Sequence, residues 1–206
     1  MSKEVINDSF GNLVEIEDNS IKYEREHIYT DEKGVPTHKV TKNSTDNMDH
    51  KYSIFNFKDN EWVPGINREK VFPYKLPKLI EGAKRGQIIF IVSGEKDADM
   101  IENLSDEFVV TTAMTSSKGK FKYDFSKYLQ KSPIIIFKDD SEYGEEFSEI
   151  TKKNLNYGRK VGICPISKIK KVLCIEDENI TDLSEVREKL QDDERLIRLL
   201  KSVQGG

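Results

Sequence analysis

Residues 87–144 decide the fold, and two apolar runs within them each end in an acidic turn. The first run and its turn read QIIFIVSGEKDAD over residues 87–99, and the second pair reads PIIIFKDDSEYG over residues 133–144. Continuous β-branched runs of this length are typical of strands buried on both faces of a sheet. Helical spacing on either side of a third run, Phe108–Val110, predicts βαβ units and a parallel sheet. Because ligands bind beyond the carboxyl ends of such strands, both acidic turns are expected at one functional edge, where their oxygens suit a divalent metal.

Short motifs in this stretch resemble the Toprim domain of bacteriophage-type DNA primases and primase-helicases. The segments that carry the resemblance are Gly94–Asp99, Thr111–Thr112 and Phe137–Gly144. The family's first motif is a strand ending in Glu-Gly, with an Asp three residues after the Gly, and Gly94 and Asp97 fit it. Its second motif is Asp-x-Asp with a Gly three residues later, and Asp139 and Gly144 fit it. The resemblance implies an α/β fold with a Toprim-like parallel sheet flanked by helices.

The sequence departs from the family at two catalytic positions. The family's catalytic Glu falls on Ser93, and its second Asp falls on Ser141. Toprim enzymes use the Glu as general acid or base and the Asp pair to hold Mg²⁺. Serine cannot act as a general base near neutral pH and is a weak, neutral ligand for this ion. The resemblance therefore implies a degenerate site that binds Mg²⁺ weakly or not at all.

A rearranged site is the alternative to a lost one. The carboxylates from which it could be rebuilt are Glu95, Asp97, Asp139 and Asp140. Asp139 and Asp140 are the candidate metal ligands, although adjacent side chains of an extended turn diverge. Acidic residues in the first turn of a helix also have a simpler explanation, since they suit the positive end of its dipole. That explanation applies equally to Glu95, Asp97 and Asp99.

The first 86 residues are predicted to form a small antiparallel β-lobe with a connecting helix. Apolar and polar residues alternate in several segments that are separated by turn signals, at residues 13–17, 21–29, 35–40 and 52–57. The order of an Asp-x-x-Gly turn, Trp-x-x-Gly and Pro-Tyr-x-Leu-Pro resembles the segment before Toprim in phage-type primases. The matching residues are Asp31, Gly34, Trp62, Gly65, Pro73, Tyr74, Leu76 and Pro77. We divide the chain into this lobe, residues 1–86, and a Toprim-like domain with C-terminal helices, residues 87–206.

The rest of the second domain is expected to alternate between helices and short strands. Helical spacing predicts a helix over residues 142–156 and one or two more over residues 183–203. Short apolar runs predict strands at residues 161–164 and 172–175. The acidic residues 176–178 would then follow a strand at the functional edge of the sheet.

Composition indicates a soluble cytoplasmic protein with no membrane partner. The net charge is −4, so the overall charge does not indicate nucleic-acid binding, but residues 51–86 are basic. Two cysteines without metal-ligand spacing make zinc a poor candidate. The candidate nucleic-acid-binding residues lie in this basic segment and in a lysine-rich loop around Phe121: Arg68, Lys70, Lys75, Lys118, Lys120 and Lys122. An ordinary solvated loop is the alternative for the last three.

Three functions remain in competition. The first is a catalytically impaired Toprim-like protein that binds nucleic acid or a nucleic-acid-processing complex, such as a phage or mobile-element modulator or inhibitor of a host defence complex. The second is an active Mg²⁺-dependent Toprim nuclease or primase with a rearranged metal site. The third is a protein-only adaptor with a vestigial site. The chain lacks a Gly-x-x-x-x-Gly-Lys loop, so an ATPase motor is not expected.

Overall fold

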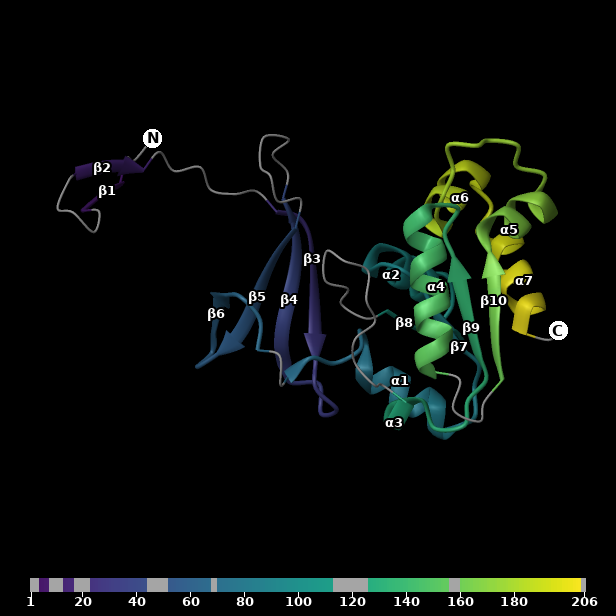
Figure 1. Cartoon of the computed structure of the whole chain (residues 1–206), viewed down its shortest axis with the longest axis horizontal. Coiled ribbons are helices and arrows are strands. Elements are labelled where there is room, and N and C mark those ends of the chain that lie inside the picture. Colours follow the sequence, from purple (N-terminus) through teal and green to yellow (C-terminus); the bar gives the residue numbers. More distant parts are fainter. Residues whose placement is uncertain are drawn as a thin grey trace.

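An antiparallel sheet and an α/β body make up the structure (Figure 1). The computed structural model describes residues 4–7, 13–16, 23–43, 52–67, 70–112, 126–155 and 160–204. For residues 4–7, 13–16, 23, 24 and 43 it describes the backbone alone. Within the described segments, no helix combines the length and the apolar character needed to cross a membrane.

The α/β body is built on a four-stranded parallel sheet, as expected. Its strands are β7 (Ile89–Ile91), β8 (Val109–Thr111), β9 (Ile134–Lys138) and β10 (Val161–Pro165). Their order in the sheet is β10-β9-β7-β8, and Ile89 lies beside both Val109 and Ile134. The chain therefore runs from β7 to β8 on one side and then crosses back to β9 on the other side of β7. This reversal places the topological switch point, where such sheets bind ligands, between the carboxyl ends of β7 and β9.

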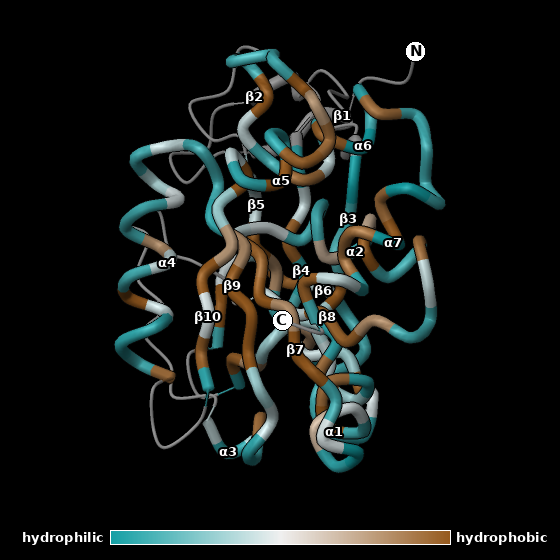
Figure 2. Tube along the Cα trace, turned by 90° about the vertical axis from the view of Figure 1, so that its right-hand side faces the viewer, coloured by the Kyte–Doolittle hydropathy of each residue, from teal (hydrophilic) through white to brown (hydrophobic). Residues whose placement is uncertain are grey.

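Helices cover both faces of this sheet (Figures 1 and 2). One face packs against α1 (Leu76–Lys84), α3 (Ser126–Leu129) and α4 (Glu142–Leu155), with Leu79 and Phe147 fully buried. The other face packs against α2, α5, α6 and α7, which span Glu95–Leu104, Ile166–Leu173, Leu183–Leu190 and Asp193–Gln204. Successive β7 residues alternate between these cores, since Ile89 and Ile91 belong to the first and Phe90 to the second. This alternation explains the continuous apolar run that the strand shows in the sequence.

The prediction of a strand at residues 172–175 is wrong. Val172 and Leu173 close helix α5, and Cys174 adopts a left-handed backbone conformation that ends it. The buried residues Ile166, Ile169 and Leu173 recur at helical spacing, and Val172 is 55% exposed on the opposite side. The acidic residues 176–178 therefore follow a helix rather than a strand.

The predicted antiparallel lobe is confirmed as a second sheet. It contains β3 (Tyr23–Thr30), β4 (Pro36–Asn43), β5 (Tyr52–Lys58) and β6 (Glu61–Pro64) in sequence order. A further hairpin pairs β1 (Glu4–Asn7) with β2 (Leu13–Ile16). Tyr29 and Val40 of the four-stranded sheet are buried in the same core as Phe90 and Ala98 of the α/β body. The two sheets thus share one apolar core.

The segment before α1 is tied to the end of β8. The hydroxyl of Thr111 donates to the carbonyl of Tyr74 at 2.7 Å, and the amide of Tyr74 donates to the carbonyl of Thr112 at 2.8 Å. The connecting helix expected before residue 87 is observed as α1, and Pro77 lies in its first turn. These contacts place the Pro-Tyr and Thr-Thr motifs of the sequence side by side.

Candidate functional site

Ser93 and Asp139 meet at the switch point of the parallel sheet. Ser93 follows β7, and Asp139 follows β9. The hydroxyl of Ser93 donates a hydrogen bond to Oδ2 of Asp139 at 2.5 Å. The position that carries the catalytic Glu in the family pattern is therefore occupied by a donor that holds the neighbouring carboxylate.

Asp97 is held at this edge by a residue much later in the chain. It lies in the first turn of α2 and is 4% exposed. Its Oδ1 accepts hydrogen bonds from the backbone amide of Ser184, at 2.9 Å, and from the hydroxyl of the same residue. Asp182 caps the helix in which Ser184 lies, since its side chain accepts from the amide of Glu185 at 2.8 Å. The start of α6 therefore brings a further carboxylate towards Asp97.

Burial and mutual repulsion disturb the acidity of this cluster. Burial raises the pKa of Asp139 to about 7. The hydrogen bond from Ser93 opposes this rise, and the charges of Asp97, Asp182 and Asp140 add to it. Burial and the charge of Asp182 raise the pKa of Asp97 to about 6, against hydrogen bonds from Ser184 that lower it. Burial also raises the pKa of Asp182. The carboxyl groups of Asp97, Asp139 and Asp182 therefore lose their protons at a higher pH than ordinary aspartates do.

The described side chains do not form a ready magnesium site. Among the residues that the structure describes, no three acidic, histidine or cysteine side chains converge as metal ligands would. Asp140 turns away, because its Oδ1 accepts from the amide of Ser167 at 3.0 Å and its Oδ2 pairs with Nζ of Lys170 at 3.2 Å. The divergence expected of Asp139 and Asp140 is thus observed, and the arrangement does not fit a hard octahedral ion.

Ser141 acts in the turn that starts α4. Its hydroxyl oxygen accepts from the backbone amide of Gly144 at 3.0 Å, as a capping residue does. Gly144 itself passes close to the strand end, since a Cβ at this position would lie 2.3 Å from the carbonyl oxygen of Asp139. The spacing between Asp139 and Gly144 therefore has a packing reason that does not require a metal.

Glu95 faces the antiparallel sheet instead of the switch point, and Asp99 does the same. Glu95 accepts from the hydroxyl of Tyr29 at 2.6 Å. Asp99 contacts Nδ1 of His27 at 2.9 Å, the hydroxyl of Tyr74 at 3.0 Å and Nζ of Lys75 at 2.7 Å. Burial alone would raise the pKa of Asp99, but these hydrogen bonds outweigh it and lower the value to about 2. Both carboxylates join the two sheets of the protein.

The predicted nucleic-acid contacts stay predictions. Arg68, Lys118, Lys120 and Lys122 lie outside the described residues. Lys70 is exposed just before the segment that leads into α1. The ammonium of Lys75 is bound internally by Asp99 and Glu102.

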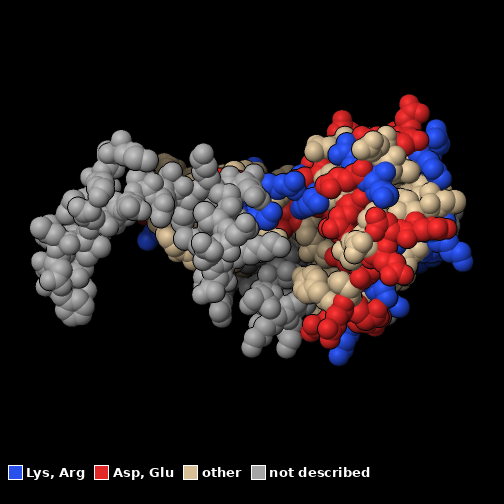
Figure 3. All heavy atoms as spheres, turned by 90° about the horizontal axis from the view of Figure 1, so that it is seen from above, with Lys and Arg blue, Asp and Glu red and all other residues tan. Residues whose placement is uncertain are grey.

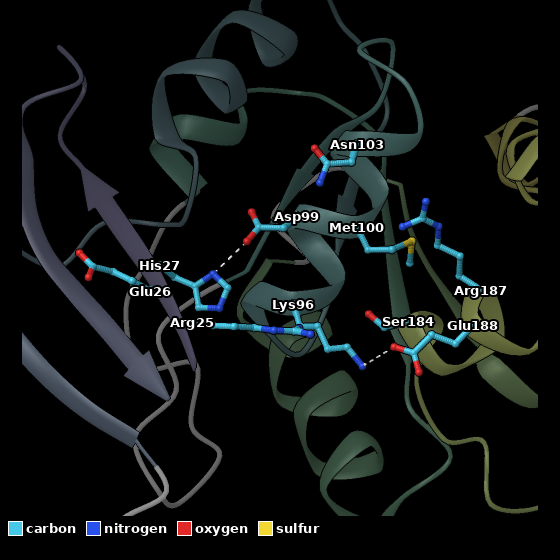
Figure 4. Close-up of a pocket in the computed structure, with 10 residues that line it drawn as sticks. All are labelled: Arg25, Glu26, His27, Lys96, Asp99, Met100, Asn103, Ser184, Arg187 and Glu188. Carbon is cyan, nitrogen blue, oxygen red and sulfur yellow. Dashed lines mark hydrogen bonds and ion pairs between the residues drawn. The ribbon is translucent and has the colours of Figure 1, made fainter. Parts of the chain in front are cut away.

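A polar cleft that sequence reasoning missed lies between β3, α2 and α6 (Figure 4). Its volume is about 380 Å³. Three cations line it, Arg25, Lys96 and Arg187, together with three carboxylates, Glu26, Asp99 and Glu188. Lys96 pairs with Glu188 across the cleft at 3.4 Å, and Arg187 pairs with Asp193. Figure 3 shows Lys and Arg side chains gathered where the α/β body meets the rest of the chain, beside a surface dominated by acidic side chains. Arg25, Lys96 and Arg187 come from three distant segments of the chain, so no local sequence motif predicts the cleft.

Comparisons with known proteins agree with this architecture. No protein-family model matches the chain, and no curated protein sequence matches it. In fold it is similar to solved primase structures. A DNA primase domain from Pseudomonas aeruginosa matches 78% of this chain with a TM-score of 0.52 and 15% identity. The RNA polymerase domain of Mycobacterium tuberculosis primase DnaG matches 78% with a TM-score of 0.50 and 12% identity. The match spans 48% of the first structure and 52% of the second, about half of each. The chain therefore has a primase-like, Toprim-like fold.

Proposed function

We propose that this protein is a catalytically impaired Toprim-like protein that binds nucleic acid or a nucleic-acid-processing complex. The observation that carries the proposal is the hydrogen bond from Ser93 to Asp139 at the switch point. A neutral hydroxyl occupies the position of the expected general base, and the carboxylate beside it has a pKa raised to about 7. With Ser141 engaged as a helix cap, the site lacks the charge that a magnesium ion requires.

The cleft between β3, α2 and α6 supports an anionic partner. Arg25, Lys96 and Arg187 line it from three elements. Ser184 lines it as well, and its amide binds Asp97, so the cleft lies close to the acidic cluster. Arg and Lys side chains at such a junction suit the phosphates of a nucleic-acid backbone. We assign the cleft, together with the predicted residues Arg68, Lys70, Lys118, Lys120 and Lys122, to backbone contacts; Lys75 is left out because Asp99 and Glu102 bind its ammonium.

The finer role follows from the resemblance to phage-type primases. A Toprim-like chain without catalysis suits a phage or mobile-element factor that modulates or inhibits a host complex, including a defence complex, in the cytoplasm. This step rests on analogy at the level of fold.

Two measurements test the proposal. Magnesium-dependent cleavage or primer synthesis on labelled DNA and RNA should be absent, and binding of single strands should weaken linearly with the logarithm of salt concentration. Replacing Arg25 and Lys96 by alanine should weaken binding about tenfold. It should also reduce the slope of log K against log salt concentration by about the amount expected for two lost phosphate contacts. Lys171→Ala, on the exposed side of α5, is the matched control. Salt-independent binding, or unchanged binding by the Arg25/Lys96 variant, would contradict the assignment.

An active Mg²⁺-dependent nuclease or primase with a rearranged site is the second candidate. The raised pKa values of Asp97, Asp139 and Asp182 favour it, because such clusters also mark functional sites. If the wild type cleaves or extends nucleic acid with Mg²⁺ and Asp139→Asn abolishes that activity, this candidate replaces the first.

A further inference from the structure

An apolar groove lies on the parallel sheet, away from the switch point at the carboxyl ends of β7 and β9. It is formed at the amino ends of β9 and β10, between α5 and α7, and its volume is about 590 Å³. Ile135 and Gly162 form part of its floor, and Val172 and Val203 line its two sides. Figure 2 shows the tube of β9 and β10 coloured largely hydrophobic, with no helix drawn across the lower halves of these strands.

A gap in the covering layer of helices is unusual for a sheet of this type. Parallel sheets are normally covered by helices on both faces, and the opposite face here is covered by α1, α3 and α4. Over β10 the covering layer is incomplete. Val172 of α5 is 55% exposed beside the opening. The gap therefore has the place of a missing helix in the layer.

Gly162 supports this interpretation independently. It lies in the middle of β10, where glycine weakens a strand and often marks the close approach of another segment. A Cβ added to it would meet no atom nearer than the carbonyl oxygen of Ile134 at 4.0 Å. Packing among the described residues therefore gives no reason for the missing side chain, whereas a ligand lying on the strand does.

The charge of the groove specifies the chemistry of its occupant. The charged side chains among its described lining residues are Lys160 and Lys168, and no acidic residue lines it. This is notable in a chain with 37 acidic residues and a net charge of −4. Lys168 and Val172 are one helical turn apart, so a cation and an exposed apolar side chain border the same opening. An occupant needs an apolar stripe flanked by carboxylates.

We propose that this groove docks an acidic amphipathic helix of a partner protein. The helix would complete the layer over β9 and β10, insert apolar residues spaced by three or four positions, and place carboxylates beside Lys168. The surface is distinct from the nucleic-acid contacts, so it adds a protein partner to the proposed function and does not depend on it.

A labelled peptide pair tests the docking surface. The probe is a 14-residue helical peptide with leucines at i, i+3, i+4 and i+7 and flanking glutamates; its control carries lysines instead. Fluorescence anisotropy with the full chain should show at least tenfold tighter binding of the acidic peptide. Lys168→Glu should weaken that binding at least fivefold, and Lys171→Glu, on the same helix but outside the groove, should leave it unchanged. Equal binding of both peptides, or equal effects of both variants, overturns the proposal.

Gly162→Val supplies the steric test. Valine suits a strand and fills the groove, so peptide binding should fall at least tenfold while the melting temperature is maintained and binding of single-stranded nucleic acid is unchanged. Retained peptide binding by this folded variant overturns the proposal. Analytical ultracentrifugation tests a second copy of the chain as the occupant. If the wild type is a dimer that Gly162→Val converts to a monomer, a second copy fills the groove and the partner helix is wrong.

Discussion

Asp139 is a carboxyl group whose ionisation opposes folding. Folding raises its pKa from 3.8 to about 7, chiefly through burial. Its contribution to stability is therefore complete below about pH 4 and is lost as the pH rises through 7. We expect Asp139→Asn to raise the free energy of unfolding at pH 8 by about 1 to 4 kcal/mol, with little effect at pH 4. Denaturant unfolding at both pH values measures this, and equal effects at the two would contradict it.

Restoring the two missing carboxylates should restore affinity for metal. We expect the double variant Ser93→Glu, Ser141→Asp to bind Mg²⁺ at least about tenfold more tightly than the wild type, because each new charge is worth roughly 4 kcal/mol to an ion at 4 Å before desolvation. Calorimetry and metal-dependent thermal stabilisation measure the change. Activity is not expected to return, because orienting a general base demands more than its presence. Ser93→Gln with Ser141→Asn is the uncharged control.

At the scale of elements, the approach of α4 to the end of β9 depends on Gly144. A Cβ there would lie 2.3 Å from backbone atoms of Asp139, which cannot move without shifting the strand. We expect Gly144→Ala to lower stability by about 1 to 3 kcal/mol. Gly162→Ala is the control, because its Cβ enters open space. Thermal unfolding compares the two, and a neutral Gly144→Ala would show that the turn relaxes freely.

The elements also show which features the sequence could predict. The β-branched runs and the turns after them locate β7, β8 and β9 because most residues of those strands are buried, on one face of the sheet or the other. The strand predicted at residues 172–175 was wrong, because a short apolar run does not show that one of its members, Val172, faces solvent. The contacts of Asp97 and Asp140 could not be predicted from the sequence either. Their partners Ser184 and Lys170 are local to neither acidic turn and reach them only when the chain returns to the sheet.

At the scale of the whole molecule, we expect the antiparallel sheet and the α/β body to unfold as one cooperative unit, because they share an apolar core. Tyr29 contributes to their common core, and α1 buries Leu76 and Leu79 against the parallel sheet. A fragment of residues 87–206 would expose both contact surfaces. We expect it to lack a cooperative thermal transition, and limited proteolysis of the full chain should release no stable fragment beginning near Gln87. Recovery of such a fragment with a sharp transition would separate the two parts.

The bond between Asp97 and Ser184 also sets an order of events during synthesis. These residues are 87 positions apart, so Asp97 leaves the ribosome long before the backbone amide and hydroxyl of Ser184 that donate to it. Until α6 emerges, closing the first βα unit would bury an uncompensated acid. The nascent chain must therefore keep this edge hydrated, and refolding should include a late step in which protonating Asp97 substitutes for the absent donors. That step should be faster at pH 5 than at pH 8.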